Sequence, residues 1–445
     1  MFQTLKEQFR YLRQHYFVRN VALLQMGGFA GTLIQAGAGV ILARLLQPEL
    51  FGVYTLAFGL AGLASVFLGS GAQEAIGTVA GETYARRDRE GTTDAFVFLM
   101  KLAIFSGILT LLLATLLPLV ADTVYGNGFI GRYAAIIIGG SVVSTLVFAP
   151  TALGLQVVGR IGFLTLLGLA DQSVRFGLSV LFTFLGFGIA GAVSGHLVGA
   201  AAVLVIAAFL WKQAVQGGVI PSLSEILKRL WHVKLRRYFS FSIWIAVDRN
   251  VANLFAILPV LITGVFVAIS EVAFFKLAFG YMNIALSLLG PVSTLLNVEF
   301  PKIRVMNQHR LRRNFIKVSL YALGLSVVLT AGALAVSPFV FRILYGQAYL
   351  PSIPYVFGLT LYGALFGIGV GLGPMWRALN ELKTSIIINL LTLAIGVPLG
   401  IWFMQLWHVW GAVAMITFWY TISHLTSFLY LVRRLRKIEE SSQDV

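Results

Sequence analysis

Twelve long apolar runs constrain this chain more than any other feature of its sequence. A helix that crosses the hydrocarbon core of a bilayer needs about 20 consecutive, mostly apolar residues. The sequence therefore predicts an all-α polytopic membrane protein with twelve transmembrane helices. The predicted spans cover residues 20–42, 50–73, 96–120, 133–155, 162–186, 189–211, 239–264, 271–297, 318–342, 354–378, 384–405 and 410–431.

The basic residues are sorted between alternate gaps of these runs. Of the 33 lysines and arginines, 25 lie in the N-terminal segment, in every second gap and in the C-terminal tail. Only Arg44, Arg132 and Arg342 lie in gaps on the opposite side. Cytoplasmic loops carry such an excess of positive charge, so both termini are predicted to be cytoplasmic. The net charge of +16 thus reports orientation and attraction to anionic membrane lipids, and nucleic acid is excluded as a partner.

Weak internal similarity indicates two six-helix halves. Leu56-Ala-Phe-Gly59 recurs as Leu277-Ala-Phe-Gly280, and Gly191-Ala-Val193 recurs as Gly411-Ala-Val413, at offsets of 221 and 220 residues. An even number of spans in each half predicts a pseudo-twofold axis along the membrane normal, with a substrate site between the lobes, as in many transporters. The predicted parts are an N-terminal lobe over 1–215, an amphipathic cytoplasmic connector over 216–238, a C-terminal lobe over 239–432 and a cytoplasmic tail over 433–445.

The turn between the first two runs carries a family resemblance. It reads Leu42-Ala-Arg-Leu-Leu-Gln-Pro-Glu-Leu-Phe-Gly-Val-Tyr54. This turn resembles the signature of polysaccharide and O-antigen flippases in the multidrug/oligosaccharidyl-lipid/polysaccharide exporter superfamily. A basic N-terminal segment that ends in Asn20 and the pair Gly159-Arg160 also agree with that family. Gln47 departs from the pattern, which has glycine there.

The resemblance implies a function. Such a protein translocates an undecaprenyl-pyrophosphate-linked oligosaccharide from the cytoplasmic to the outer leaflet, for O-antigen and lipopolysaccharide biosynthesis. It implies a bacterial inner-membrane transporter that is not an enzyme and has no cofactor. Membrane lipids and other polysaccharide-assembly proteins are the expected partners.

Five basic residues escape the sorting between loops: Lys101, Arg175, Arg249, Lys276 and Arg377. A basic side chain at the middle of a transmembrane helix costs about 2.5–3.5 kcal/mol, so it needs a counter-charge or a watery cavity. Arg249 and Lys276 enter the membrane from opposite sides and are predicted to bind the pyrophosphate, with Arg175 and Asp248 completing the site. The alternative is a structural network of the two cations with Asp248 and Glu271.

Acidic residues inside the spans suggest coupling to a cation. Asp171 lies four residues before Arg175, so the two share a helix face and form either an ion pair or part of a cavity. Asp171 and Asp248 are candidates for binding Na⁺ or H⁺. Arg377 and Glu381 repeat the spacing and predict a second ion pair.

Neutral polar residues in the spans are candidates for a glycan path. The translocated glycan has to stay hydrated, so its route needs polar and aromatic side chains. The candidates are Gln25, Gln35, Asn253, Tyr281 and Asn283.

Two other functions remain open. A cation-coupled multidrug antiporter of the same superfamily is the nearest alternative, although the intramembrane charge is net basic and favours an anionic substrate. An integral-membrane glycan polymerase or ligase is a further one, although the predicted outer loops are too short for a catalytic domain. The sequence has no cysteine, and its acids show no spacing typical of metal ligands. His196 and His424 are interpreted as residues of helix packing.

Overall fold

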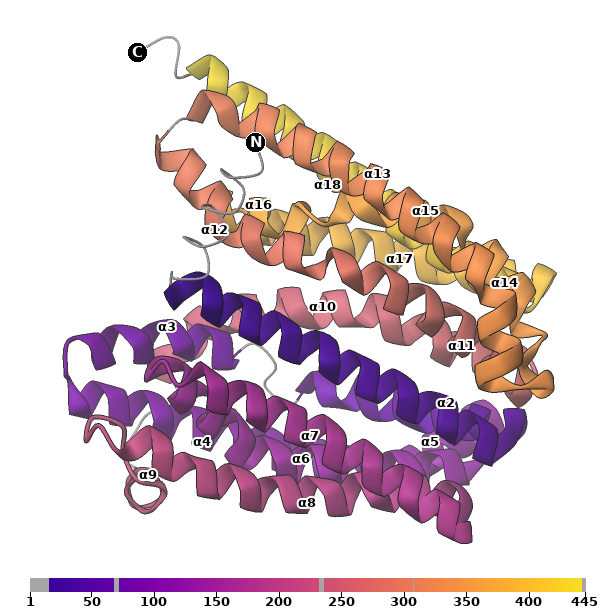
Figure 1. Cartoon of the computed structure of the whole chain (residues 1–445), viewed down its shortest axis with the longest axis horizontal. Coiled ribbons are helices and arrows are strands. Elements are labelled where there is room, and N and C mark those ends of the chain that lie inside the picture. The colour runs from indigo at the N-terminus through magenta and orange to yellow at the C-terminus, as the bar shows by residue number, and fades with distance from the viewer. Residues whose placement is uncertain (1–15, 68–71, 232–235, 307, 442–445) are drawn as a thin grey trace, which may run out of the picture. The chain divides into compact units, whose positions relative to one another are not determined.

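The computed structural model describes residues 16–67, 72–231, 236–306 and 308–441, and every regular element in these ranges is helical (Figure 1). The longer helices are α2 (Tyr16–Ala64), α3 (Ala72–Ala85), α4 (Arg89–Ala114), α5 (Leu117–Tyr125), α6 (Gly128–Val157), α7 (Ile161–Phe182), α8 (Gly188–Val215), α9 (Leu223–Arg229), α10 (Arg236–Phe266), α11 (Ile269–Leu286), α12 (Gly290–Met306), α13 (Gln308–Val340), α14 (Ser352–Gly358), α15 (Thr360–Gly369), α16 (Leu372–Leu379), α17 (Leu382–Trp407) and α18 (Val409–Ser441). Short turns of 3₁₀ or π helix link some of them, among them η3 (Ser287–Leu289) and η5 (Gln347–Tyr349).

Two of the apolar helical segments are too long to be single spans. Within the described ranges, nine segments are long and apolar enough to cross a membrane, and a bent pair formed by α14 with α15 and α16 makes ten. The segments Ala22–Ala64 and Ile161–Val215 have 43 and 55 residues. At a rise of 1.5 Å per residue they measure about 65 and 80 Å, between two and three times the thickness of a bilayer core of about 30 Å. Each therefore contains two spans, which accounts for the twelve predicted.

Local backbone geometry explains both bends. In the first segment, Gln47 has φ +59°, and Pro48 follows it without an amide hydrogen for the helix. In the second, Gly186 and Gly188 have φ +95° and +54° in the turn between α7 and α8. The predicted break after the first run is thus confirmed, and it occurs at the residue that departs from the family pattern. The end of the second predicted run, residues 68–71, lies outside the described residues.

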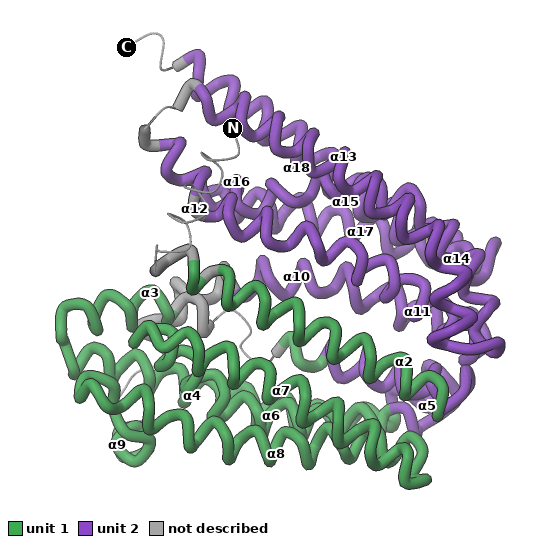
Figure 2. The backbone as a smooth tube through the Cα atoms, viewed as in Figure 1, with its two compact units in different colours: residues 1–45, 64–119, 131–243 green, residues 46–63, 120–130, 244–445 purple. Residues whose placement is uncertain are grey.

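The chain forms two compact units (Figure 2). The first comprises residues 1–45, 64–119 and 131–243, and the second comprises residues 46–63, 120–130 and 244–445. The main division falls near the predicted start of the second half. Residues 46–63, which include most of the signature turn, belong to the second unit although they lie early in the sequence.

The first unit has an apolar core to which six helices contribute. Large buried side chains include Phe96 and Phe98 of α4, Leu153 of α6 and Trp211 of α8. Phe96 and Trp211 meet edge to face, with ring centroids 5.5 Å apart. Helix α9 also packs into this core through Ile226, so its apolar face is covered by protein.

Helix α9 forms part of the predicted connector over residues 216–238. It ends at Arg229, while Val233 and Lys234 lie outside the described residues. Ser222 caps the helix, accepting a hydrogen bond from the Glu225 amide at 3.2 Å. Glu225 also pairs with Arg89 at 3.1 Å, which ties the connector to the beginning of α4.

The second unit packs the latter part of α2 against α10 through glycines. A Cβ on Gly59 would lie 2.8 Å from Leu261, and a Cβ on Gly264 would lie 2.6 Å from Leu56. A Cβ on Gly52 would lie 2.1 Å from the carbonyl oxygen of Ile269. Gly52 of the signature turn is therefore required for close packing against the beginning of α11.

The predicted ion pair between Arg377 and Glu381 is wrong. Helix α16 ends at Leu379, and Asn380 adopts a left-handed conformation with φ +58°, so Glu381 no longer follows the helix. Glu381 instead accepts hydrogen bonds from the hydroxyl of Tyr430 at 2.8 Å and from Nε of Arg434 at 2.6 Å. Arg377 donates to Oδ1 of Asn297 at 3.0 Å.

Candidate functional site

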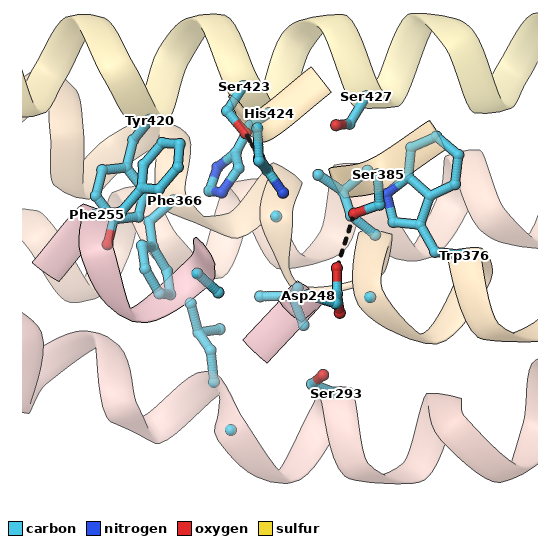
Figure 3. A pocket seen from close by; sticks show the side chains of 18 of the residues that line it. Asp248, Phe255, Ser293, Phe366, Trp376, Ser385, Tyr420, Ser423, His424 and Ser427 are labelled. Carbon is cyan, nitrogen blue, oxygen red and sulfur yellow. Dashed lines mark hydrogen bonds between the residues drawn. The ribbon is translucent and has the colours of Figure 1, made fainter. Parts of the chain in front are cut away.

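The second unit contains an open cavity of about 500 Å³ between its membrane-spanning helices, with several polar side chains among its largely apolar lining (Figure 3). Asp248 of α10 supplies a carboxylate, and α17 supplies Ser385 and Asn389. Helix α18 presents four further residues on one face: Tyr420, Ser423, His424 and Ser427. Such polar groups are expensive inside a bilayer and typically mark a substrate or ion pathway.

Several oxygen atoms line the cavity, and the cationic side chain of Arg377 lines it as well. The hydroxyl of Ser385 donates to Oδ1 of Asp248 at 3.4 Å, and the two side chains point toward each other (Figure 3). The hydroxyl of Ser423 donates to Oδ1 of Asn389 at 2.6 Å. A carboxylate with neutral oxygen ligands suits a hard cation such as Na⁺, and a carboxylate can equally accept a proton. The described residues contain no cluster of three histidines, cysteines or acids that would hold a transition metal.

His424 adds a polar group without a hydrogen-bond partner in the described chain. Its Nδ1 is buried and unpaired there. The imidazole lies against the backbone of α15, because a Cβ on Gly369 would be 2.4 Å from the ring. Tyr420 and Phe366 also contact the ring, at centroid distances of 5.5 and 6.2 Å. His424 is predicted to be a hydrogen-bonded residue of helix packing; it packs between helices, but its Nδ1 makes no hydrogen bond to the described residues, and the ring lines the cavity.

An aromatic wall closes the other end of the cavity. Tyr420 contacts Phe255 and Tyr362, with ring centroids 5.7 and 4.9 Å apart. The hydroxyl of Tyr362 donates to Oδ1 of Asn283 at 2.6 Å. Tyr362 and Asn283 do not line the cavity, so the rings of Tyr420 and Phe255 are the aromatic groups here that can contact an organic ligand.

The two cations predicted to bind pyrophosphate do not line this cavity. Arg249 is exposed at the surface of α10, one position from Asp248. Lys276 of α11 is half-buried and makes no hydrogen bond or ion pair with any part of the chain that the structure describes. Glu271, its suggested structural partner, caps α11 instead by accepting from the amide of Ala268 at 3.1 Å. The alternative network of Lys276 with Glu271 is therefore wrong.

Asp171 and Arg175 form the ion pair that their spacing predicts. Nε and Nη2 of Arg175 donate to the two carboxylate oxygens at 2.7 and 2.6 Å. Nη2 also donates to the hydroxyl of Ser144 at 3.3 Å. Asp171 is only 5% exposed. Its carboxylate is thus neutralised within the first unit, whereas its role in cation coupling stays a prediction.

The predicted glycan path is distributed over both units. Gln25 and Gln35 lie on α2 in the first unit, half-buried and exposed respectively. Asn253 is exposed on α10 in the second unit. The hydroxyl of Tyr281 donates to the carbonyl of Ala333 at 2.8 Å, and Asn283 accepts from Tyr362 as described above. The path itself stays a prediction.

Sequence reasoning missed most of the cavity. Ser385 and Asn389 are four residues apart in an apolar span, as are Tyr420 and His424, and Ser423 and Ser427. Polar residues at this spacing share one helix face, so the pattern was available in the sequence. It did not reveal which helices face each other, because that depends on long-range packing.

Solved structures of known transporters share this fold. An inward-facing multidrug resistance MATE family transporter of the MOP superfamily is 14% identical and superposes with a TM-score of 0.76, over 92% of this chain and 96% of the other. An outward-facing one is 14% identical, with a TM-score of 0.67 over 96% and 98%. The eukaryotic MATE transporter AtDTX14 is 15% identical, with a TM-score of 0.67 over 96% and 100%. No curated protein matches the sequence.

The solved structures show only the fold, whereas a family model also assigns the chain to a protein family. Residues 41–354, more than half of the chain, match the model described as "Polysaccharide biosynthesis protein". The matched region begins at the signature turn. The predicted fold class, an all-α polytopic membrane protein with twelve spans in two lobes, is confirmed by the helices and by the shared fold. The chain belongs to the polysaccharide biosynthesis protein family and has the fold of the MOP superfamily transporters.

Proposed function

We propose that this protein is a flippase that moves an undecaprenyl-pyrophosphate-linked oligosaccharide from the cytoplasmic to the outer leaflet of a bacterial inner membrane. The observation that carries the proposal is the match of residues 41–354 to the polysaccharide biosynthesis family. The fold is one in which related transporters adopt inward- and outward-facing conformations, which supports alternating access. Translocation breaks no covalent bond, so the protein acts without catalysis.

Lys276 supports an anionic substrate. It is a half-buried cation on a membrane-spanning helix, and the described chain gives it no counter-charge. A pyrophosphate that leaves water needs charge-assisted hydrogen bonds to offset its lost hydration. Lys276 would supply one such bond, and Arg249, exposed on α10, would supply others.

The cavity around Asp248 is the proposed coupling site. Its carboxylate and the neighbouring hydroxyl and amide oxygens fit Na⁺ or a proton. Occupation changes the charge inside the second unit, and a cation bound in one conformation only would favour that conformation. Asp171 is the weaker candidate, because Arg175 already neutralises it.

The charge distribution supports cytoplasmic termini, and the absence of native cysteine provides a direct test. We expect Arg86→Cys to be labelled by a membrane-impermeant maleimide only after cells are opened. We expect Asp122→Cys to be labelled in intact cells with a permeable outer envelope. Both side chains are exposed. The reverse labelling pattern would contradict the orientation.

Reconstitution tests the transport function. Purified protein is placed in vesicles that contain a fluorescent undecaprenyl-pyrophosphate oligosaccharide, and a membrane-impermeant lectin reports the glycan that reaches the outer surface. We expect protein-dependent exposure of the glycan, with Lys276→Ala much slower than wild type. Vesicles without protein and vesicles with Lys302→Ala, which removes an exposed lysine paired with Glu299, are the controls.

The antiporter alternative has one observation in its favour. The cavity of the second unit combines a carboxylate with aromatic side chains, which are the groups that recognise a cationic organic molecule. The same vesicles loaded with a cationic dye distinguish the two functions. Dye efflux driven by a Na⁺ or H⁺ gradient, without glycan exposure, would replace the flippase proposal by a multidrug antiporter.

A further inference from the structure

A second concave surface lies within the first unit, between the beginnings of α2 and α7. Its volume is about 760 Å³. Two segments far apart in the sequence line it, residues 19–26 and 159–166. Asn20 and the pair Gly159-Arg160, which agree with the family pattern, lie in the same groove.

The groove is a wedge that narrows along the helices. A Cβ on Gly27 would lie 2.3 Å from Cγ2 of Thr165, and a Cβ on Gly31 would lie 3.3 Å from Gln172, so α2 and α7 touch at this level. Nearer their beginnings the groove lies between the two helices, where a Cβ on Gly162 would meet no atom within 4 Å. From Arg19 to Gly27 the wedge is about 12 Å deep at 1.5 Å per residue.

Charge and apolar surface are separated along this wedge. Arg19 and Arg160 line its open end, and none of its lining residues is acidic. Further in, the walls are apolar and exposed: Met26 is 71% exposed and Leu166 is 53% exposed. A ligand that matches this arrangement has an anionic head and an apolar chain.

Neutral side chains hold Arg160 in place at the open end of the groove. The guanidinium of Arg160 donates to the amide oxygens of Gln213 and Gln216, the latter at 2.6 Å, and lies 5.9 Å from the ring of Phe163. No carboxylate of the described chain pairs with it. Its position is thus fixed while its positive charge is retained, and its remaining N–H groups can donate to a phosphate.

We infer that this groove binds the lipid end of the substrate in the cytoplasmic leaflet: the pyrophosphate at Arg19 and Arg160, and the beginning of the polyprenyl chain along Leu23, Met26 and Leu166. The inference rests on the proposed function and on the orientation given by the basic residues. Two arginines match the charge of a pyrophosphate better than that of a singly charged phospholipid. A single chain also suits a wedge that closes at Gly27.

A fluorescent reporter in the groove tests the inference. Gly162→Cys offers a labelling position with free space around it, and Leu166→Cys is a second one should the first disturb folding. The labelled full-length protein in phosphatidylcholine nanodiscs is titrated with undecaprenyl pyrophosphate. We expect a saturable change in emission. We expect Arg19→Gln with Arg160→Gln to raise the half-saturating concentration about tenfold or more, since two charge-assisted contacts are lost.

Three comparisons decide the result. Arg86→Gln removes an exposed basic residue of the same unit outside the groove, and should leave the titration unchanged. Undecaprenol, which lacks the pyrophosphate, should give no saturable change. An equal response to phosphatidylglycerol would overturn the inference in favour of a general site for anionic lipid, and so would the absence of any response to undecaprenyl pyrophosphate.

The glycan-exposure assay separates this inference from the proposed function. Glycan exposure by wild-type protein with no response in the groove would refute the groove and leave the flippase intact. Binding in the groove without glycan exposure would refute the flippase and leave the groove as a lipid site.

Discussion

Two aspartates in membrane-spanning helices, one in each unit, are held in opposite ways. Asp171 accepts hydrogen bonds from Nε and Nη2 of Arg175 and is almost fully buried. Asp248 is half-buried, accepts a hydrogen bond from the hydroxyl of Ser385 and lines the cavity of the second unit. A carboxylate neutralised by a guanidinium has little to gain from another cation, whereas the carboxylate of Asp248 lines a cavity. The first pair therefore stabilises its unit, and the coupling role proposed for Asp248 is tested below.

The largest expected effect comes from Asp171→Ala. It leaves the guanidinium of Arg175, whose side chain is 22% exposed, without its carboxylate. Breaking a buried pair in this way costs about 3–5 kcal/mol, so the thermal unfolding temperature of the purified protein should fall strongly. Asp171→Ala combined with Arg175→Leu should recover much of the loss. An unchanged unfolding temperature in the single variant would contradict the stabilising role of Asp171.

Asp248→Asn should act on transport rather than on stability. We expect glycan exposure to fall by about a hundredfold, equivalent to about 2.7 kcal/mol, with an almost unchanged unfolding temperature. In wild type, added Na⁺ should raise the unfolding temperature, since a ligand that binds only the folded state stabilises it. Asp248→Asn should abolish that rise. A variant that transports like wild type would contradict the coupling site.

Gly369→Ala tests whether the cavity has a defined shape. The new methyl group would overlap the ring of His424, and overpacking of this kind costs about 1–3 kcal/mol. We expect a lower unfolding temperature and slower glycan exposure. Gly373→Ala is the matched control, because Gly373 lines the same cavity and a Cβ there meets no atom within 4 Å. Equal behaviour of the two variants would show that His424 moves freely.

Ser385→Ala is the mildest change. It removes one neutral hydroxyl from Asp248 and should cost about 1 kcal/mol of cation binding, or about fivefold in the half-saturating Na⁺ concentration. The measurement is the Na⁺ dependence of the unfolding temperature. Ser224→Ala on the exterior of α9 is the control. A loss as large as that of Asp248→Asn would show that the hydroxyl, and not the carboxylate, dominates binding.

The sequence predicted the parts of the molecule that depend on local pattern. Apolar length located the spans, and a spacing of four residues located the pair of Asp171 with Arg175. The same rule failed for Arg377 and Glu381, because the left-handed Asn380 ends the helix between them. The cavity escaped prediction because α10, α17 and α18 meet there only through tertiary packing.

Residues 46–63 are synthesised early but pack in the second unit, most of which is synthesised much later. This order has a consequence for biogenesis. Their packing partners around Ile257 to Ile269 are made about 200 residues later, which at about 5–20 residues per second is a delay of about 10–40 s. During that time the face of this segment that carries Gly59 and Gly62 lacks its native packing partner, α10. Substitutions at Gly59 or Gly264 should therefore lower the yield of correctly assembled protein in cells, through capture by quality control, more than they lower the stability of the molecules that complete assembly.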